Sequence, residues 1–454
     1  MSSASGAGGA GQECDPGRVT TGVWKAARQE DLEGLRGVTE IDGTLDISGE
    51  VSDLSPLACL TTITGELLIG DTRSLSHLDG LRSLSFIGAR LALIRNASLL
   101  NLEGLRSLRQ VAASIEIRDN RLLETLVGPA ASTPVWHVAD NQSLGSLAGL
   151  EHVEEATLFI EGNDQLMTLY GLRNLRRGLL GLIDNDALTS LEGLGAVEQL
   201  AELVISRNDR LVSLQGLDRL TAVGELSLWN NRQLSSLRGL DGLVSADTIE
   251  ISSNDSLTNL SALAGVTELS QLALSKNSAL VSLTGLEQIS KLNGLHIREN
   301  PRLTSLEGLN GLRDVLSGIG IFRNPALTSL DGLGSFSAGG GLIEVVEIEG
   351  NEALVDIDTL GGLTRVSQLV IRNNDALLGL TGLEDTAELE GLTVEGNRSL
   401  ATLRGLGART IHDRIEIMRN ESLPSCEVQA LVERLDGPPE SVLEENNGAG
   451  TCSP

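Results

Sequence analysis

Residue types that support catalysis or metal binding are few in this chain and lie far apart. The 454 residues include five histidines and four cysteines. Only His137 and His296 fall at an exposed position of the repeated motif described below, and seven repeats separate them, which corresponds to roughly 30 Å. The sequence contains no Ser/His/Asp grouping, no Cys-x-x-Cys pair and no phosphate-binding glycine loop. We therefore expect no enzymatic activity, no metal and no cofactor.

Side chains suited to recognition recur instead at the exposed positions of the same motif. Large aromatic residues beside charged ones, such as Trp229 and Phe322 near Arg298 or Glu250, are typical of protein-binding hot spots. The alternative is that they are isolated exposed apolar residues and solvated charges. The candidate ligand-binding residues are Glu116, His137, Phe159, Glu161, Trp229, Glu250, His296, Arg298 and Phe322.

A repeat of about 23 residues must position these side chains, and one asparagine recurs at the same place in each repeat. Each marking asparagine follows an apolar-x-apolar triplet, such as Leu203-Val204-Ile205 before Asn208, at a distance of three residues. Regular spacing in this range indicates a repeat array. The fifteen asparagines are Asn96, Asn120, Asn141, Asn163, Asn185, Asn208, Asn231, Asn254, Asn277, Asn300, Asn324, Asn351, Asn374, Asn397 and Asn420.

Each repeat reads as one coil of a solenoid. The triplet alternates with period two, which is typical of a half-buried strand, and the remaining leucines come every three residues, which favours an irregular or 3₁₀ return path. Triplets from Leu45-Asp46-Ile47 to Ile415-Glu416-Ile417 predict about 17 coils. We expect a β-dominated solenoid of the α/β type with one parallel sheet, capped at both ends, because a single coil cannot fold without its neighbours.

The asparagines are predicted to point inward and to form a structural ladder. An amide side chain offers donors and an acceptor to backbone groups that the turn after each strand leaves unpaired. Five of them also begin glycosylation sequons, but an inward side chain cannot carry a sugar. The prediction is therefore a structural role.

The four cysteines lie at the two ends of the array. Cys14 and Cys59 fall in the first coils, and Cys426 and Cys452 follow the last one. Three pairings are possible, and this separation favours the disulfides Cys14–Cys59 and Cys426–Cys452. Disulfides imply an oxidising compartment. The alternative is four reduced thiols in a cytosolic protein.

The net charge of the chain disfavours some classes of binding partner. The net charge is −28, and among 34 basic residues three are lysine. This excess of acid disfavours binding to nucleic acid or to anionic lipid. It also gives a solvated surface that keeps a leucine-rich chain soluble. No run of 18 apolar residues and no signal peptide is present in the sequence as given.

The repeated phrase Asn-x-x-Leu-x-x-Leu-x-Gly-Leu-x-x-Leu, followed by the triplet, resembles the receptor L-domain branch of leucine-rich-repeat proteins. It is similar to bacterial surface lipoproteins as well. Leucine stands three residues after the asparagine, as in Asn208-Asp209-Arg210-Leu211. The resemblance implies a right-handed solenoid, a protein or glycan ligand, and a secreted or surface location in a bacterial envelope, with any lipid anchor or export signal encoded outside this sequence.

The sequence thus predicts one non-enzymatic recognition scaffold, monomeric, that binds a ligand along its strand face. The alternative is a structural envelope spacer without a ligand. A glycine-rich insertion at 335–341 either contacts a partner or is a tolerated insertion. The predicted parts are a flexible Ser/Gly/Ala-rich tether over 1–13, an N-terminal cap over 14–40, the solenoid over 41–423, and a C-terminal cap with a short helix over 424–454.

Overall fold

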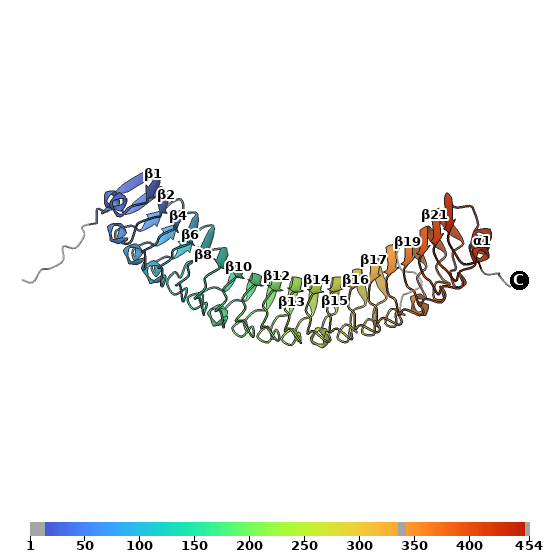
Figure 1. Ribbon diagram of the computed structural model, residues 1–454. Helices are drawn as coiled ribbons and strands as arrows, with labels where there is room; N and C mark the ends of the chain where they lie inside the picture. Colours follow the sequence, from blue (N-terminus) through green and yellow to red (C-terminus); the bar gives the residue numbers. More distant parts are fainter. Residues whose placement is uncertain (1–13, 335–341, 450–454) are drawn as a thin grey trace, which may run out of the picture. The chain divides into compact units, whose positions relative to one another are not determined.

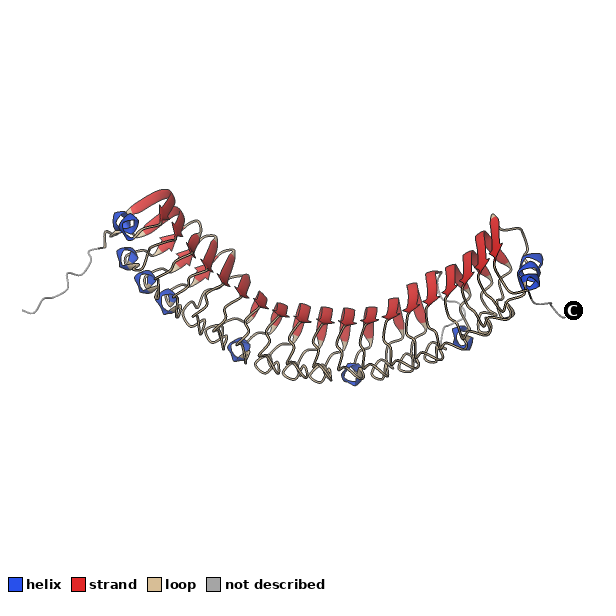
Figure 2. Cartoon of the chain, viewed as in Figure 1, coloured by secondary structure: helices blue, strands red, loops and turns tan. Residues whose placement is uncertain are grey.

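The computed structural model describes residues 14–334 and 342–449. The chain divides into two compact units, Met1–Val197 and Glu198–Pro454, and each is described by itself. The predicted insertion at 335–341 and the predicted Cys426–Cys452 bond lie outside the described residues. In each unit the strands line one side and the loops the other (Figures 1 and 2).

The first unit is a parallel solenoid of eight main strands. Each pairs with the next main strand in parallel register. A second short parallel ladder runs beside it through β3 (Thr62–Ile63), β5 (Phe86–Ile87) and β7 (Gln110–Val111). The main strands are β1 (Val19–Ala26), β2 (Glu40–Ile47), β4 (Leu67–Gly70), β6 (Arg90–Ile94), β8 (Ser114–Arg118), β9 (Val135–Ala139), β10 (Glu155–Glu161) and β11 (Arg177–Ile183). The 3₁₀ turns of this unit are η1 (Gln29–Leu35), η2 (Ser55–Leu57), η3 (Asp79–Leu81), η4 (Glu103–Leu105) and η5 (Tyr170–Leu172).

The second unit continues the same pattern over eleven strands, again parallel in register. They are β12 (Gln199–Ser206), β13 (Ala222–Trp229), β14 (Ser245–Ser252), β15 (Glu268–Ser275), β16 (Lys291–Arg298), β17 (Asp314–Phe322), β18 (Ile343–Glu349), β19 (Arg365–Arg372), β20 (Glu388–Glu395), β21 (Thr410–Met418) and β22 (Ser441–Glu445). The helical segments are η6 (Ser261–Leu263), η7 (Asp358–Leu360) and α1 (Ser425–Glu433). The predicted β-dominated parallel solenoid is confirmed. The seventeen predicted strands are β2 to β21 without the short β3, β5 and β7, and β1 and β22 add one strand at each end.

Alternation along each strand separates core from surface. In β14 the side chains of Ile249 and Ile251 are buried, whereas Glu250 between them is exposed. The return path then tightens into a turn that a polar side chain caps. The Asn259 Oδ1 accepts from the Ser261 N–H at 3.1 Å, and the Thr402 Oγ1 does the same for Arg404 at 3.0 Å. These caps account for the Ser, Thr and Asn residues that precede most of the turns.

Close stacking explains the glycine of the Leu-x-Gly-Leu phrase. A Cβ on Gly104 would lie 2.0 Å from the Leu78 carbonyl oxygen, and one on Gly308 would lie 2.2 Å from that of Leu283. Both contacts are with backbone of the preceding coil, which cannot move aside. Only glycine therefore allows the coils to approach this closely.

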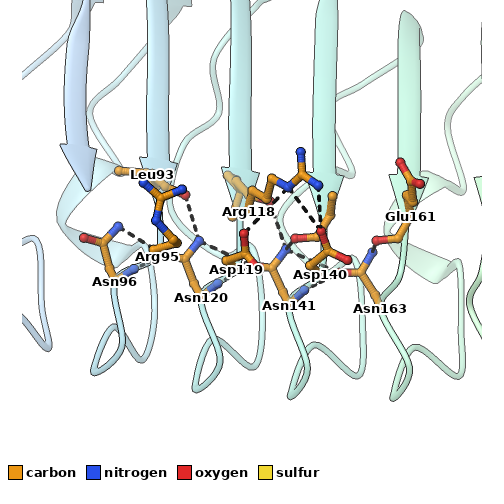
Figure 3. A network of polar contacts seen from close by, with 12 residues as sticks. Leu93, Arg95, Asn96, Arg118, Asp119, Asn120, Asp140, Asn141, Glu161 and Asn163 are labelled. Carbon is orange, nitrogen blue, oxygen red and sulfur yellow. Dashed lines mark hydrogen bonds and ion pairs between the residues drawn. The ribbon is translucent and has the colours of Figure 1, made fainter. Parts of the chain in front are cut away.

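The asparagines form a buried ladder. All fifteen side chains are fully buried. In the first unit, the Asn120 Nδ2 donates to the Leu93 carbonyl at 2.8 Å, and its backbone N–H donates to the Asn141 Oδ1 at 3.1 Å (Figure 3). Thr72 begins the ladder by donating to the Asn96 Oδ1 at 2.7 Å. In the second unit, Asn447 extends the ladder beyond Asn420.

The two ends close the exposed leucine layers. The predicted Cys14–Cys59 disulfide forms, with a Cα–Cα distance of 5.4 Å. At the other end, α1 buries Val428 and Leu431. Among the described residues, no helix has the length and apolar content needed to cross a bilayer.

Candidate functional site

The strand face of the second unit presents outward side chains in two parallel columns. Because the side-chain period of a strand is two, residues in register on neighbouring strands share one face. One column runs through Ala273, His296, Gly320 and Glu347 on β15 to β18. The other runs, two residues further along each strand, through Ser275, Arg298, Phe322 and Glu349.

Residues of these two columns line an open hollow of about 350 Å³. That volume is at the lower end of the range of roughly 300–1,000 Å³ for ligand pockets, so it suits one or two side chains. The structure thus brings together three of the sequence-predicted residues, His296, Arg298 and Phe322. The lining consists of Ala273, Leu274, Ser275, His296, Arg298, Phe322, Arg323 and Glu349.

Gly320 makes the hollow possible. A Cβ there would lie 2.3 Å from Phe322 Cε2 and 3.1 Å from His296 Cδ2. The phenyl ring therefore lies over the glycine, against the sheet, instead of standing away from it. A glycine inside a strand often marks such a close approach, so the sequence itself contains a signal for this residue. Sequence reasoning also missed Ser275 and Arg323.

Positive charge concentrates beside the hollow. The carboxylate of Glu299 lies 2.9 Å from Arg298 Nε, 3.5 Å from Arg323 Nη1 and 3.9 Å from Lys276 Nζ. The hydrogen bond from Arg298 lowers the pKa of Glu299, and the charges of Lys276 and Arg323 add to the effect. Each of the three cations exposes more than half of its side chain, whereas Glu299 exposes 27%. The charge that meets solvent here is therefore mainly cationic.

The structure does not bring Trp229 and Glu250 into this hollow. Trp229 is half-buried, and the Arg207 guanidinium carbon lies 5.5 Å from the centre of its ring. Glu250 is exposed on the next strand, in register with Ser227. A partner would have to displace Arg207 to reach one face of the Trp229 ring.

In the first unit, the remaining candidates occupy neighbouring strands. The rings of His137 and Phe159 stack with centroids 4.9 Å apart. Phe159 also lies near Gly181, where a Cβ would be 3.1 Å from Phe159 Cδ1. Glu116 accepts a hydrogen bond from Arg90 at 3.2 Å. Glu161 is exposed at the end of β10 (Figure 3).

A second hollow in the second unit is larger and mainly polar. It measures about 650 Å³ and lies where β17 to β21 end, lined mostly by arginines and carboxylates. Its arginines are paired, for example Arg398 with Asp375 at 3.0 Å and Arg419 with Glu395 at 2.9 Å. Over the part of the chain that the structure describes, no group of three or more His, Cys, Asp or Glu residues could hold a metal ion.

Comparison with known proteins adds little to this geometry. No protein-family model and no curated protein sequence matches the chain. Among solved structures, the chain is similar to TLR13 in a complex with ssRNA13, at 15% identity over 93% of this chain and 83% of that one, with a TM-score of 0.27. It is similar to the functional domain of InlJ from Listeria monocytogenes, at 16% identity over 83% and 76%, with a TM-score of 0.29.

The internalin InlF from Listeria monocytogenes is a further similar structure, at 14% identity over 92% of this chain and 88% of that one, with a TM-score of 0.27. At such TM-scores none of these similarities supports an assignment. The fold follows from the strand pairing itself.

Proposed function

We propose that this protein is a non-enzymatic recognition scaffold that binds a protein ligand on the strand face of its second unit. The observation that carries the proposal is the hollow beside Phe322, where His296, Arg298 and Phe322 converge on a regular parallel sheet. A rigid sheet holds such side chains in place before binding, which reduces the entropy lost on association.

A protein ligand suits this surface better than a glycan. The hollow offers one phenyl ring and an imidazole beside two guanidinium groups, which is a typical composition for the centre of a protein interface. The stacked pair of His137 and Phe159 offers a second aromatic surface in the first unit.

We further propose a location at the cell surface or outside the cell. The Cys14–Cys59 disulfide supports it, because disulfides persist in oxidising compartments. The leucine three residues after each asparagine supports the receptor L-domain branch of the leucine-rich repeats. The chain is proposed to act as a monomer with no nucleic-acid partner, in keeping with its net charge of −28.

Site-specific photo-crosslinking tests recognition against a purely structural role. p-Benzoylphenylalanine would replace Phe322 on the strand face or, as a control, Val281, which is 46% exposed on the return path. The full chain would be irradiated with the cell-envelope fraction and culture medium of its source. We expect a discrete crosslinked protein from position 322 and none from 281. Crosslinks absent from 322, or equal at both positions, would favour the envelope spacer.

A further inference from the structure

The second unit contains a longer internal repeat, which provides a natural comparison for the hollow. Strands β15 to β17 and β19 to β21 share the phrases Ser-Gln-Leu, at 270–272 and 367–369, and Leu-Thr-Gly-Leu-Glu, at 283–287 and 380–384. Both also share a register shift in the third strand, opposite Gly294 in the first copy and Gly391 in the second. In both copies a glutamine oxygen, of Gln271 or Gln368, lies 2.3 Å from where the glycine Cβ would be.

The two copies have the same backbone plan but different side chains on the strand face. Register makes Thr393 the equivalent of His296, Glu416 that of Gly320, and Met418 that of Phe322. Thr393 and Glu416 are hydrogen-bonded to each other at 3.2 Å, and Arg414 pairs with Glu416 at 3.3 Å.

The second copy has a hollow that shares only three equivalent positions with the first, Val370, Arg372 and Thr393. It is lined mainly by charged and hydroxyl side chains. Arg372, which stands where the first copy has Ser275, pairs with Glu395 at 3.4 Å. The aromatic, partly apolar hollow is therefore a property of the side chains of the first copy and not of the repeat.

The charge at this hollow differs from that of the chain as a whole. Lys276, Arg298 and Arg323 share the single carboxylate of Glu299, and Glu349 adds one more carboxylate at the wall. Among the residues that line the hollow, the two cations Arg298 and Arg323 stand against the one carboxylate of Glu349, in a protein of net charge −28. Guanidinium groups bind carboxylates through paired, charge-assisted hydrogen bonds. The contrast favours a ligand group with one negative charge, carried by a segment that is otherwise neutral or basic.

We propose, on the basis of the function proposed above, that the hollow binds a protein segment in which an aromatic or branched aliphatic side chain stands next to a single carboxylate. The apolar side chain packs on Phe322 and His296 above Gly320. The carboxylate accepts hydrogen bonds from Arg298 and Arg323. Additional acidic residues in the segment weaken binding, because the surrounding protein repels them.

A random dodecapeptide library displayed on phage, selected on the immobilised full chain, provides the probe. Affinities of the enriched peptides would be measured by fluorescence anisotropy. We expect a shared pair of one aromatic or branched aliphatic residue and one Asp or Glu. Phe322→Ala and Gly320→Ala should each weaken binding about tenfold or more, since the first removes the contact surface and the second displaces the ring.

Matched controls separate the hollow from its surroundings. Arg298→Gln and Arg323→Gln should each weaken binding by about 10- to 100-fold. Lys276→Gln removes another partner of Glu299, but Lys276 does not line the hollow, so its effect should be several-fold smaller. Met418→Ala, at the equivalent position of the second copy, should leave the affinity unchanged. Changing the peptide's Asp or Glu to its amide should weaken binding to the wild type more than to either arginine variant, since each variant keeps one of the two arginines.

The outcomes distinguish the proposed ligand chemistry from the proposed recognition on the strand face. Peptides that respond to Phe322→Ala and Gly320→Ala, but share no carboxylate or ignore both arginine variants, would overturn the ligand chemistry and leave strand-face recognition in place. Peptides that bind all variants equally would overturn strand-face recognition itself. A selection that enriches no sequence over the bare support would overturn the proposed ligand chemistry.

Discussion

Removal of one asparagine from the middle of the ladder should destabilise the second unit strongly. The Asn254 side chain is fully buried. Its Nδ2 donates to the carbonyls of Leu228 at 2.9 Å and Ser252 at 3.1 Å, and its Oδ1 accepts from the backbone N–H of Asn231 at 3.1 Å and from the Asn231 side chain at 3.2 Å. Asn254→Ala deletes all four hydrogen bonds.

The magnitude follows from the groups left without a partner. The Ser252 carbonyl keeps a second donor, the N–H of Asn230 at 3.0 Å. The Asn231 N–H loses the bond that Asn254 supplies, whereas the Leu228 carbonyl lies inside β13 and stays in the parallel ladder with β14. A buried polar group without a partner costs about 1–3 kcal/mol and each of the other three lost bonds about 0.5–1.5 kcal/mol, so the expected loss is about 2.5–7.5 kcal/mol in the free energy of unfolding.

Asn259→Ala is the matched control within the same coil. Its half-buried side chain accepts one turn bond, from the Ser261 N–H at 3.1 Å, and donates one to the hydroxyl of the exposed Thr258 at 3.1 Å. Loss of a bond of this kind costs about 0.5–1.5 kcal/mol. The two asparagines stand five residues apart, so chain position and residue type are nearly constant and burial is the main difference.

Native-state hydrogen exchange followed by mass spectrometry is the appropriate assay, because repeat arrays unfold in parts and a single global transition is not assured. Asn254→Ala should speed exchange most in β13 and β14, with urea unfolding shifted to lower concentration. Equal losses for Asn254→Ala and Asn259→Ala would refute the reasoning, since the ladder would then contribute no more than an ordinary turn bond.

Three further predictions concern the first unit and the stacking of coils. Cys14→Ser opens the loop closed with Cys59, and thermal unfolding of the first unit should shift by the equivalent of about 4 kcal/mol. A reductant should then shift the unfolding of the first unit in the wild type but not in the variant. Gly308→Ala places a Cβ 2.2 Å from a backbone carbonyl of the preceding coil, whereas the nearest atom to a Cβ on Gly379 is 3.6 Å away. Urea titration should show that Gly308→Ala lowers the free energy of unfolding by about 3 kcal/mol or more, and that Gly379→Ala lowers it little. The pKa of Asp164 is raised by desolvation and by nearby aspartates, so its charged form opposes folding above that pKa. Asp164→Asn should therefore raise the melting temperature at pH 7. The gain should vanish in acid, where Asp164 is protonated in both the folded and the unfolded state, and it should shrink in high salt. An unchanged or lowered melting temperature at pH 7 would contradict this.

The fold was largely predictable because the information that specifies it repeats locally. Three features constrain each coil: the triplet around Ile249 and Ile251, the three-residue leucine spacing and the recurring asparagine. Every coil also packs against neighbours of nearly the same structure. The column of residues that includes His296 was therefore predictable as well, since a constant period fixes which residues align. The glycine of each coil, such as Gly308, was visible in the sequence, but its reason appears only in the distance to the preceding coil.

The candidate site could be predicted only in part, because its properties depend on side chains from different coils. Sequence reasoning selected His296, Arg298 and Phe322 by type and position. It could not show that the Phe322 ring lies over Gly320, because a ring's direction depends on the space that the next strand leaves. Nor could it show that Glu299 gathers three cations, since these come from three successive coils.

By itself, then, the sequence determined the repeat, its buried ladder and the face on which side chains are displayed, because these follow from period and polarity within one coil. The tertiary structure decided where that face is hollow and which charge meets solvent there. Both depend on rotamers and on distances between coils, and a one-dimensional pattern does not contain them.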